Sequence, residues 1–205
     1  MQLAASRTPL SIHVAETPFE SQLTRDGSGP IADFYRANGV PIEPTGKSVL
    51  RSLEDLNLVR GTTQLVHCCA VDEDDIQVIK NRNAYVAHCP RSNKRLQCPP
   101  APIREILDSG IDVGLGLDSA ASSGPIDMFA EMRSALETGI ERNKPLTAQE
   151  VWRMATAKPH LAIDDYYRSK IDKGSEPRLI KIHIQDAHDT GDIIEQAHPG
   201  LVEWI

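Results

Sequence analysis

The stretch SIHVAE, residues 11–16, decides how the rest of the chain is interpreted, because it places an imidazole and a carboxylate three positions apart. Apolar and polar residues alternate over residues 10–14, and this pattern predicts a β-strand. Side chains of a strand alternate between its two faces, so His13 and Glu16 can serve one site only if the strand ends near His13 and the chain then turns back. A strand that carries chemistry at its C-terminal end is typical of a parallel α/β architecture.

Composition and charge exclude several classes of protein. The chain has 205 residues, of which 40% are hydrophobic and 25% charged, values typical of a globular protein that can bury a core. Its net charge is −7, and no run of Lys and Arg is longer than two, which argues against a nucleic-acid partner. No apolar run is long enough for a signal peptide or a membrane span. We therefore expect a cytoplasmic protein with no nucleic-acid or membrane partner.

The four cysteines show no Cys-x-x-Cys pairing. Three of the four lie in or beside predicted strands, where a free thiol behaves as a small hydrophobic group. They are Cys68, Cys69, Cys89 and Cys98. Buried free thiols are expected here in preference to a disulfide or a cysteine zinc site.

Strands and helices alternate along most of the chain. Three further strands are expected at residues 63–69, 84–88 and 111–117. Amphipathic patterns and capping signals predict helices at residues 31–38, 48–56, 72–81, 102–110, 125–139 and 147–157. Such alternation implies a parallel sheet, because a helical crossover is the short way to join parallel neighbours. Residues 88–93 are expected to form a polar loop below the site.

Each of the four predicted strands ends in a side chain that can take part in chemistry. These side chains are His13, His67, His88 and Asp118. The carboxyl ends of parallel strands lie at one edge of the sheet, so four such groups on one rim resemble half of a barrel active site. For His88 and for the nearby Asn93 we expect a structural role.

The chain is expected to divide after residue 160. Residues 1–160 form the α/β part, and residues 161–205 form an irregular tail with one alternating strand at 179–184. Four histidines lie off the predicted rim without ligand-like spacing, and we interpret them as surface or structural residues. They are His160, His183, His188 and His198.

Several motifs occur in a fixed order along residues 10–157: HVAE at 13–16, LVHC at 65–68, HCPRSN at 88–93 and GLDS at 116–119. Together they resemble the amidohydrolase superfamily, and within it the cytosine-deaminase-like branch. That branch includes deaminases of methylthioadenosine, S-adenosylhomocysteine and aminodeoxyfutalosine, guanine deaminase, and the chlorotriazine hydrolases.

The resemblance implies strands five to eight of a (β/α)8 TIM barrel, with the tail as a degenerate remnant of the family's small β-sandwich domain. It implies that His13 and Asp118 are metal ligands, with Zn²⁺ as the metal and Fe²⁺ or Mn²⁺ as further options. Glu16 would carry a proton to the substrate ring nitrogen, His67 would orient the substrate or the hydrolytic water, and Asp118 would take the proton of that water. The implied reaction is deamination of an aminopurine nucleoside or a related small heterocycle.

One departure from the family pattern shapes the remaining expectations. The family's first strand carries a His-x-His pair that completes the metal site, and this chain contains no such pair. A half-barrel also leaves open sheet edges. We therefore expect a fragment of a longer hydrolase that needs a missing N-terminal half-barrel or a second copy of the chain, and that alone binds zinc weakly and does not deaminate. Two alternatives stay open: a non-catalytic or dimerising half-barrel paralogue, and a chlorohydrolase or amidase of the same superfamily.

Overall fold

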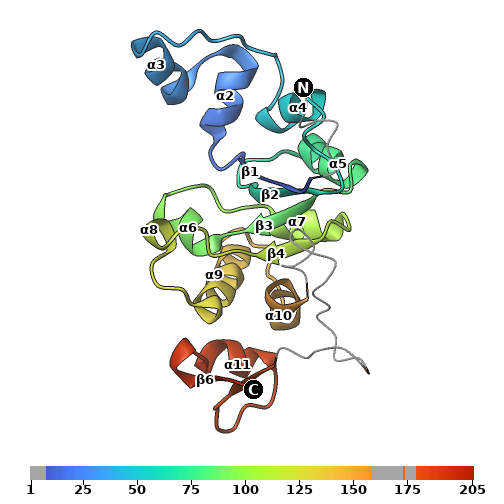
Figure 1. Cartoon of the computed structure of the whole chain (residues 1–205), viewed down its shortest axis with the longest axis vertical. Coiled ribbons are helices and arrows are strands. Elements are labelled where there is room, and N and C mark those ends of the chain that lie inside the picture. Colours follow the sequence, from blue (N-terminus) through green and yellow to red (C-terminus); the bar gives the residue numbers. More distant parts are fainter. Residues whose placement is uncertain (1–7, 158–172, 174–178) are drawn as a thin grey trace.

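The computed structural model describes residues 8–157, 173 and 179–205 (Figure 1). A four-stranded parallel sheet in the order β1-β2-β3-β4 lies in the middle of the molecule. Its strands are β1 Leu10–Val14, β2 Thr63–His67, β3 Tyr85–His88 and β4 Val113–Leu115. The prediction of four parallel strands joined by helical crossovers is confirmed.

β3 lacks one predicted residue, and β2 and β4 are shorter than predicted by more than that. β2 ends at His67 because the backbone there turns into the left-handed region, with φ of 74° at His67 and 51° at Cys68, which a strand cannot accommodate. β4 covers only Val113–Leu115, although Gly116 N still donates to His88 O across 2.8 Å. β2 therefore ends at its functional side chain, His67, whereas β4 ends at Leu115, shortly before Asp118.

Helices connect and cover the strands. They are α2 Pro18–Asp26, α3 Gly29–Ala37, α4 Val49–Asp55, α5 Glu73–Asn81, α6 Pro90–Arg95, α7 Ile103–Asp108, α8 Ala120–Ser123, α9 Met128–Glu141 and α10 Ala148–Thr156. The predicted capping boxes at the starts of α5 and α10 are both present. The prediction of a polar loop at residues 88–93 was wrong. Pro90 stands at the first turn of α6, where its fixed φ suits a helix.

One face of the sheet packs against helices and forms the main core. Alternate strand residues such as Leu65, Val86 and Val113 contribute to the same buried cluster as Ile79 of α5 and Ile106 of α7. On the other face the buried cluster contains only three residues, Val66, Ala87 and Cys89. The two faces of one sheet are therefore packed very differently within the described residues.

The C-terminal region holds more structure than the single strand expected. β5 Ile180–Ile182 pairs antiparallel with β6 Val202–Trp204, and α11 Thr190–Gln196 lies between them in the sequence, followed by the short 3-10 turn η2 Pro199–Leu201. Asp189 caps α11 by accepting from the backbone N–H groups of Gly191 and Asp192. This cap helps to explain why α11 forms in a stretch rich in polar residues, where hydrophobic periodicity does not predict a helix.

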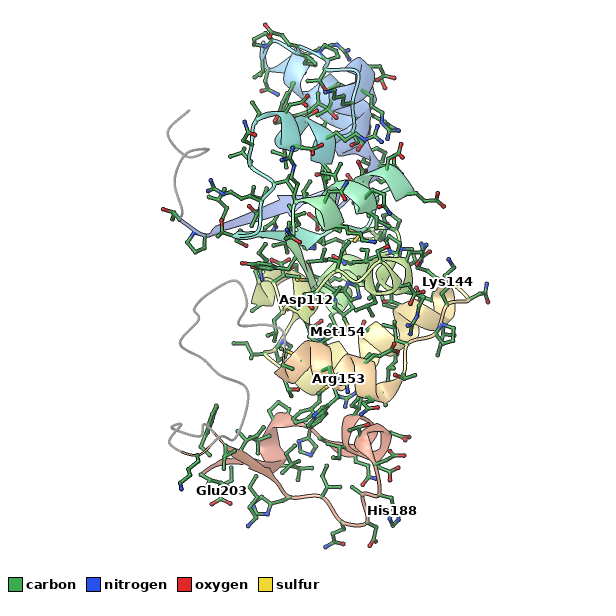
Figure 2. All side chains as sticks on the ribbon, turned by 90° about the vertical axis from the view of Figure 1, so that its right-hand side faces the viewer. Asp112, Lys144, Arg153, Met154, His188 and Glu203 are labelled. Carbon is green, nitrogen blue, oxygen red and sulfur yellow. The ribbon has the colours of Figure 1, made fainter. Side chains whose placement is uncertain are left out.

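α11 packs against α9 and α10 of the main body. Arg133 Nη1 donates to Ile194 O at 2.7 Å and to Ala197 O at 3.0 Å, so a cation meets the carbonyl groups at the end of the helix. Figure 2 shows the segment that carries His188 and Glu203 beyond the helix of Arg153 and Met154, at the end of the molecule. The expected boundary at residue 160 lies outside the described residues, and the remnant of a β-sandwich stays a prediction.

The prediction that the cysteines are free thiols is confirmed. All four are free, Cys68, Cys69 and Cys89 are buried, and Cys98 is partly exposed. Within the described ranges, none of the helices has the length and apolar character that a membrane crossing needs.

Candidate metal centre

Three of the four predicted strand-end side chains converge. His13 on β1, His67 at the end of β2 and Asp118 just after β4 offer ligand atoms that all lie within 4.8 Å of one another. The strands are parallel, so their carboxyl ends lie at one edge of the sheet and deliver these groups to the same place. His67 is fully buried, whereas His13 and Asp118 are open to solvent.

The two imidazoles contact each other directly. His67 Nε2 lies 3.1 Å from His13 Nδ1, and the ring centroids are 4.8 Å apart in an edge-to-face arrangement. The other nitrogen of His67, Nδ1, lies 2.7 Å from Oδ1 of Asn93, which is also buried. Both ring nitrogens of His67 are therefore engaged, and its ring is fixed in orientation.

Unusual backbone conformations hold two of these side chains in place. His67 and Asp118 have φ of 74° and 57°, in the left-handed region that non-glycine residues seldom adopt. Conformations of this kind cost about 1–3 kcal/mol each and gather at functional sites, where surrounding contacts enforce them. Here Cys68 N donates to Val14 O at 3.2 Å, which anchors the turn after His67 to the end of β1.

Asp118 is held by two hydroxyl groups. Its Oδ2 accepts from Ser92 Oγ at 2.6 Å and from Ser122 Oγ at 2.8 Å. Burial raises the pKa of Asp118, but these two hydrogen bonds and the nearby histidines outweigh burial and lower the pKa below its ordinary value. The carboxylate is therefore ionised at neutral pH, as a metal ligand must be.

Glu16 returns to the strand tip as expected. Its Oε1 lies 3.8 Å from His67 Nε2, and the thiol of Cys98 donates to the same oxygen at 3.7 Å. Glu20 builds the turn, because its carboxylate accepts from the backbone N–H groups of Ala15, Glu16 and Thr17 at 2.7, 2.8 and 3.0 Å. The prediction missed Glu20 and the whole of α2, although Thr17 and Glu20 have the spacing of a capping box.

His88 does not join the cluster. It is fully buried, and neither of its ring nitrogens has a hydrogen-bond partner among the described residues. Burial lowers the pKa of His88 to about 3, with the neighbouring His67 adding to the effect, so the ring is neutral at physiological pH. Its structural role stays a prediction.

The remaining described histidines lie in the C-terminal region, away from the cluster. His183 Nε2 lies 2.8 Å from Glu203 Oε2 on the facing strand, and His198 Nδ1 accepts from Gly200 N at 3.2 Å. His188 lies near the end of the molecule (Figure 2). His160 lies outside the described residues.

The donor set fits a divalent metal. Two imidazoles and one carboxylate are ligands that suit Zn²⁺, and catalytic zinc sites use three protein donors plus an open position. The predicted ligands were His13 and Asp118, and the structure adds His67 as a third donor within reach. Ser92, Ser122 and Asn93 support the donors. Ser92 and Asn93 belong to the HCPRSN motif, but no pattern in the sequence indicates which donor each contacts, and none marks Ser122.

The sequence of this chain is similar to those of known proteins. A family model described as "Amidohydrolase family" matches residues 4–196. A 5-methylthioadenosine/S-adenosylhomocysteine deaminase from Haloarcula marismortui is 33% identical over 188 residues, covering 88% of this chain and 40% of that protein. A 5'-deoxyadenosine deaminase from Methanothrix thermoacetophila is 35% identical over 118 residues, covering 56% of this chain and 29% of that protein. The chain thus spans about two fifths of the length of the curated relatives that it matches over most of its own length.

Solved structures share the fold. An adenosine deaminase from Xanthomonas campestris with bound zinc superposes with a TM-score of 0.79 at 24% identity, covering 95% of this chain and 43% of that chain. An atrazine chlorohydrolase from Arthrobacter aurescens complexed with zinc gives a TM-score of 0.59 at 25% identity, covering 79% of this chain and 33% of that chain. With a family match over nearly the whole sequence and a relative at 33% identity, the chain belongs to the amidohydrolase family.

Proposed function

We propose that this chain contributes the metal-binding rim of a hydrolase that deaminates an aminopurine nucleoside or a related heterocycle. The observation that carries the proposal is the convergence of His13, His67 and Asp118 within 4.8 Å. Glu16 adds a second carboxylate 3.8 Å from His67 Nε2. The names of the curated relatives support a nucleoside deaminase in particular.

His13 and Asp118 are the proposed metal ligands, with His67 as a third donor or as the group that orients the hydrolytic water. Bound here, a divalent metal supplies a water whose pKa lies near neutrality. Zn²⁺ suits the two nitrogens and one oxygen, and Fe²⁺ or Mn²⁺ are compatible with the same donors.

The two carboxylates have separate proposed roles. Asp118 is ionised and engages hydroxyl donors through Oδ2, so its other oxygen can accept the proton of the hydrolytic water. Glu16 Oε1 lies 3.8 Å from His67 Nε2, and Glu16 is proposed to protonate the ring nitrogen of the substrate. Protonation of the ring nitrogen would prepare the carbon that bears the amino group for attack by the water oxygen. The proton held by Asp118 would then pass to the amino group, the C–N bond would break to release ammonia, and the remaining hydroxyl proton would return to Glu16.

In architecture, we propose that β1 to β4 are strands five to eight of a (β/α)8 barrel, with residues 1–160 as the half-barrel and 161–205 as the remnant of a second domain. β1 and β4 are the outer strands of the sheet, and each pairs on one side only among the described residues. Ser11 and His13 are exposed on the face that a closed barrel would bury. A complementary half-barrel or a second copy of the chain would cover that face, and a cytoplasmic location stays a prediction.

A second reaction is supported by one observation. The fold is shared with an atrazine chlorohydrolase that was crystallised with zinc, so a metal-activated water could displace chloride from a heterocycle in place of an amine. The products separate the two reactions, because one releases ammonia and the other chloride.

The proposal is tested by replacing the aligned 188 residues of the Haloarcula marismortui relative with this chain and measuring ammonia release from methylthioadenosine. We expect ammonia release that is lost in Glu16→Gln and kept in Glu43→Gln, a matched change at an exposed loop residue. A folded, zinc-loaded chimera that releases no ammonia contradicts the proposal.

The chain by itself is expected to bind zinc weakly and to release no ammonia. Light scattering checks the alternative of a dimerising half-barrel, which predicts a stable species of two chains. A monodisperse folded monomer excludes that alternative.

A further inference from the structure

The first turn of α6 holds two residues that contact the candidate ligands. Ser92 and Asn93 follow Pro90 and are both buried. Ser92 Oγ donates to Asp118 Oδ2 at 2.6 Å, and Asn93 Oδ1 lies 2.7 Å from His67 Nδ1. One short helix therefore supports two of the three donors of the cluster.

The contact with Asn93 determines where His67 carries its proton. A neutral imidazole has one N–H group, and an amide oxygen can only accept a hydrogen bond. With Oδ1 facing the ring, Nδ1 of His67 must be the donor, and Nε2 then keeps its lone pair. With the amide reversed, its NH2 group would donate to Nδ1 and the proton would move to Nε2.

The position of Nε2 favours the first arrangement. Nε2 is the nitrogen that lies 3.1 Å from His13 Nδ1, at the side where the three donors converge. Glu16 Oε1 is 3.8 Å from Nε2, which is too far to accept a hydrogen bond from it. A metal ligand needs an unprotonated nitrogen at that side. His13 can then donate from Nδ1 to His67, which leaves its own Nε2 unprotonated.

We propose that Asn93 is a positioning residue: it accepts the Nδ1 proton of His67 and thereby keeps the Nε2 lone pair directed at His13 and Asp118. The value of this arrangement for metal binding rests on the proposed function, whereas the tautomer is a property of the chain itself. His67 is fully buried and Asn93 is 4% exposed, so no bulk water can replace the amide oxygen.

The test is ¹⁵N NMR of the full chain, labelled at the histidine rings and free of metal, at about pH 8, where most imidazoles are neutral. His67→Gln assigns the signals of His67. We expect the wild-type ring to carry its proton on Nδ1, Asn93→Asp to keep it there because an acceptor remains, and Asn93→Leu to shift it toward Nε2. Asn81→Leu, at the exposed end of α5, is the matched control and leaves the tautomer unchanged.

Zinc affinity provides the second measurement. Loss of a hydrogen-bond partner behind a metal ligand lowers affinity about 10- to 100-fold, and we expect this for Asn93→Leu but not for Asn93→Asp. A wild-type ring that carries its proton on Nε2 overturns the inference without any variant. An unchanged tautomer in a folded Asn93→Leu chain does the same. If the Nδ1 proton is observed in the wild-type chain but the folded chimera with the Haloarcula marismortui relative binds no zinc, the proposed function fails and the positioning role of Asn93 stands.

Discussion

The two faces of the sheet are built from the same strands and packed in opposite ways. Side chains of one face, such as Leu65 and Val86, lie in a continuous cluster with residues of the covering helices. The other face holds a cluster of three buried residues and leaves His13 exposed. The helix-covered face supplies the stability of the fold, whereas the other face and its carboxyl edge supply the donors of the candidate metal site.

The largest expected effect belongs to the helix-covered face. Ile106→Ala should lower the free energy of unfolding by about 2–5 kcal/mol, because Ile106 is fully buried and its removal leaves a cavity. Ser11→Ala, on the exposed side of β1, should change it by less than about 0.5 kcal/mol. Urea unfolding followed by circular dichroism measures the free energy of unfolding of both variants. An equal loss of stability in the two would contradict the proposed difference in packing between the two faces.

At the carboxyl edge, Asp118→Asn should lower zinc affinity by more than about 100-fold, a larger loss than that of a supporting residue. Asparagine tolerates the positive φ at this position and keeps the shape of the side chain, so the metal-free stability should change little. Calorimetric titration with zinc measures the affinity, with Asp33→Asn at an exposed site as control. Wild-type affinity in Asp118→Asn would rule out Asp118 as a ligand.

His88 should make stability depend on pH, because it is a buried polar residue without a partner among the described residues. The unfolded chain binds its proton near pH 6.5, whereas the folded chain resists protonation until about pH 3. The folded state therefore binds fewer protons between these values, and its stability falls as the pH is lowered through that window. The loss from this group is about 2 kcal/mol between pH 7 and pH 5.

The difference between wild type and His88→Leu isolates that contribution, since all other titrating groups are shared. Urea unfolding at several pH values should show the gap between the two proteins widening in favour of the variant as the pH falls. Parallel curves would mean that His88 has a partner that keeps its pKa near the ordinary value.

The smallest effect concerns the end of one covering helix. Asp72→Ala should lower the free energy of unfolding by about 1 kcal/mol, because Asp72 caps α5 through the backbone N–H of Asp75. Glu73→Ala, which keeps the cap, should have a smaller effect. Thermal unfolding of the two variants checks the order.

Much of the helix-covered side could be predicted from sequence. The alternating pattern of the strands and the capping boxes at Asp72 and Thr147 depend on residues close in sequence, so they are visible without a structure. α6 and α11 escaped prediction because they are short and polar, and their burial depends on distant partners such as Arg133. The nine-residue α2 was also missed, so the length of an element does not by itself decide whether local patterns reveal it.

Only part of the candidate site could be predicted from the sequence. His13, His67 and Asp118 lie near the carboxyl ends of strands of a parallel sheet, which brings them to one edge. Topology alone does not decide which residues converge, because His88 ends β3 and does not join them. The partners of these residues come from other elements: Asn93 lies 26 residues from His67 in the sequence, and Ser92 lies 26 residues from Asp118. Nothing local in the sequence links such pairs.

We propose that the carboxyl edge of the sheet binds a divalent metal through histidine and aspartate. X-ray absorption spectroscopy of the zinc-loaded chain tests it most directly, because Zn–N distances of about 2.0–2.1 Å differ from Zn–S distances of about 2.3 Å. We expect imidazole nitrogen and oxygen donors around the zinc, with one imidazole fewer in His13→Ala. Sulfur donors from the cysteines, or a wild-type spectrum in His13→Ala, would contradict it.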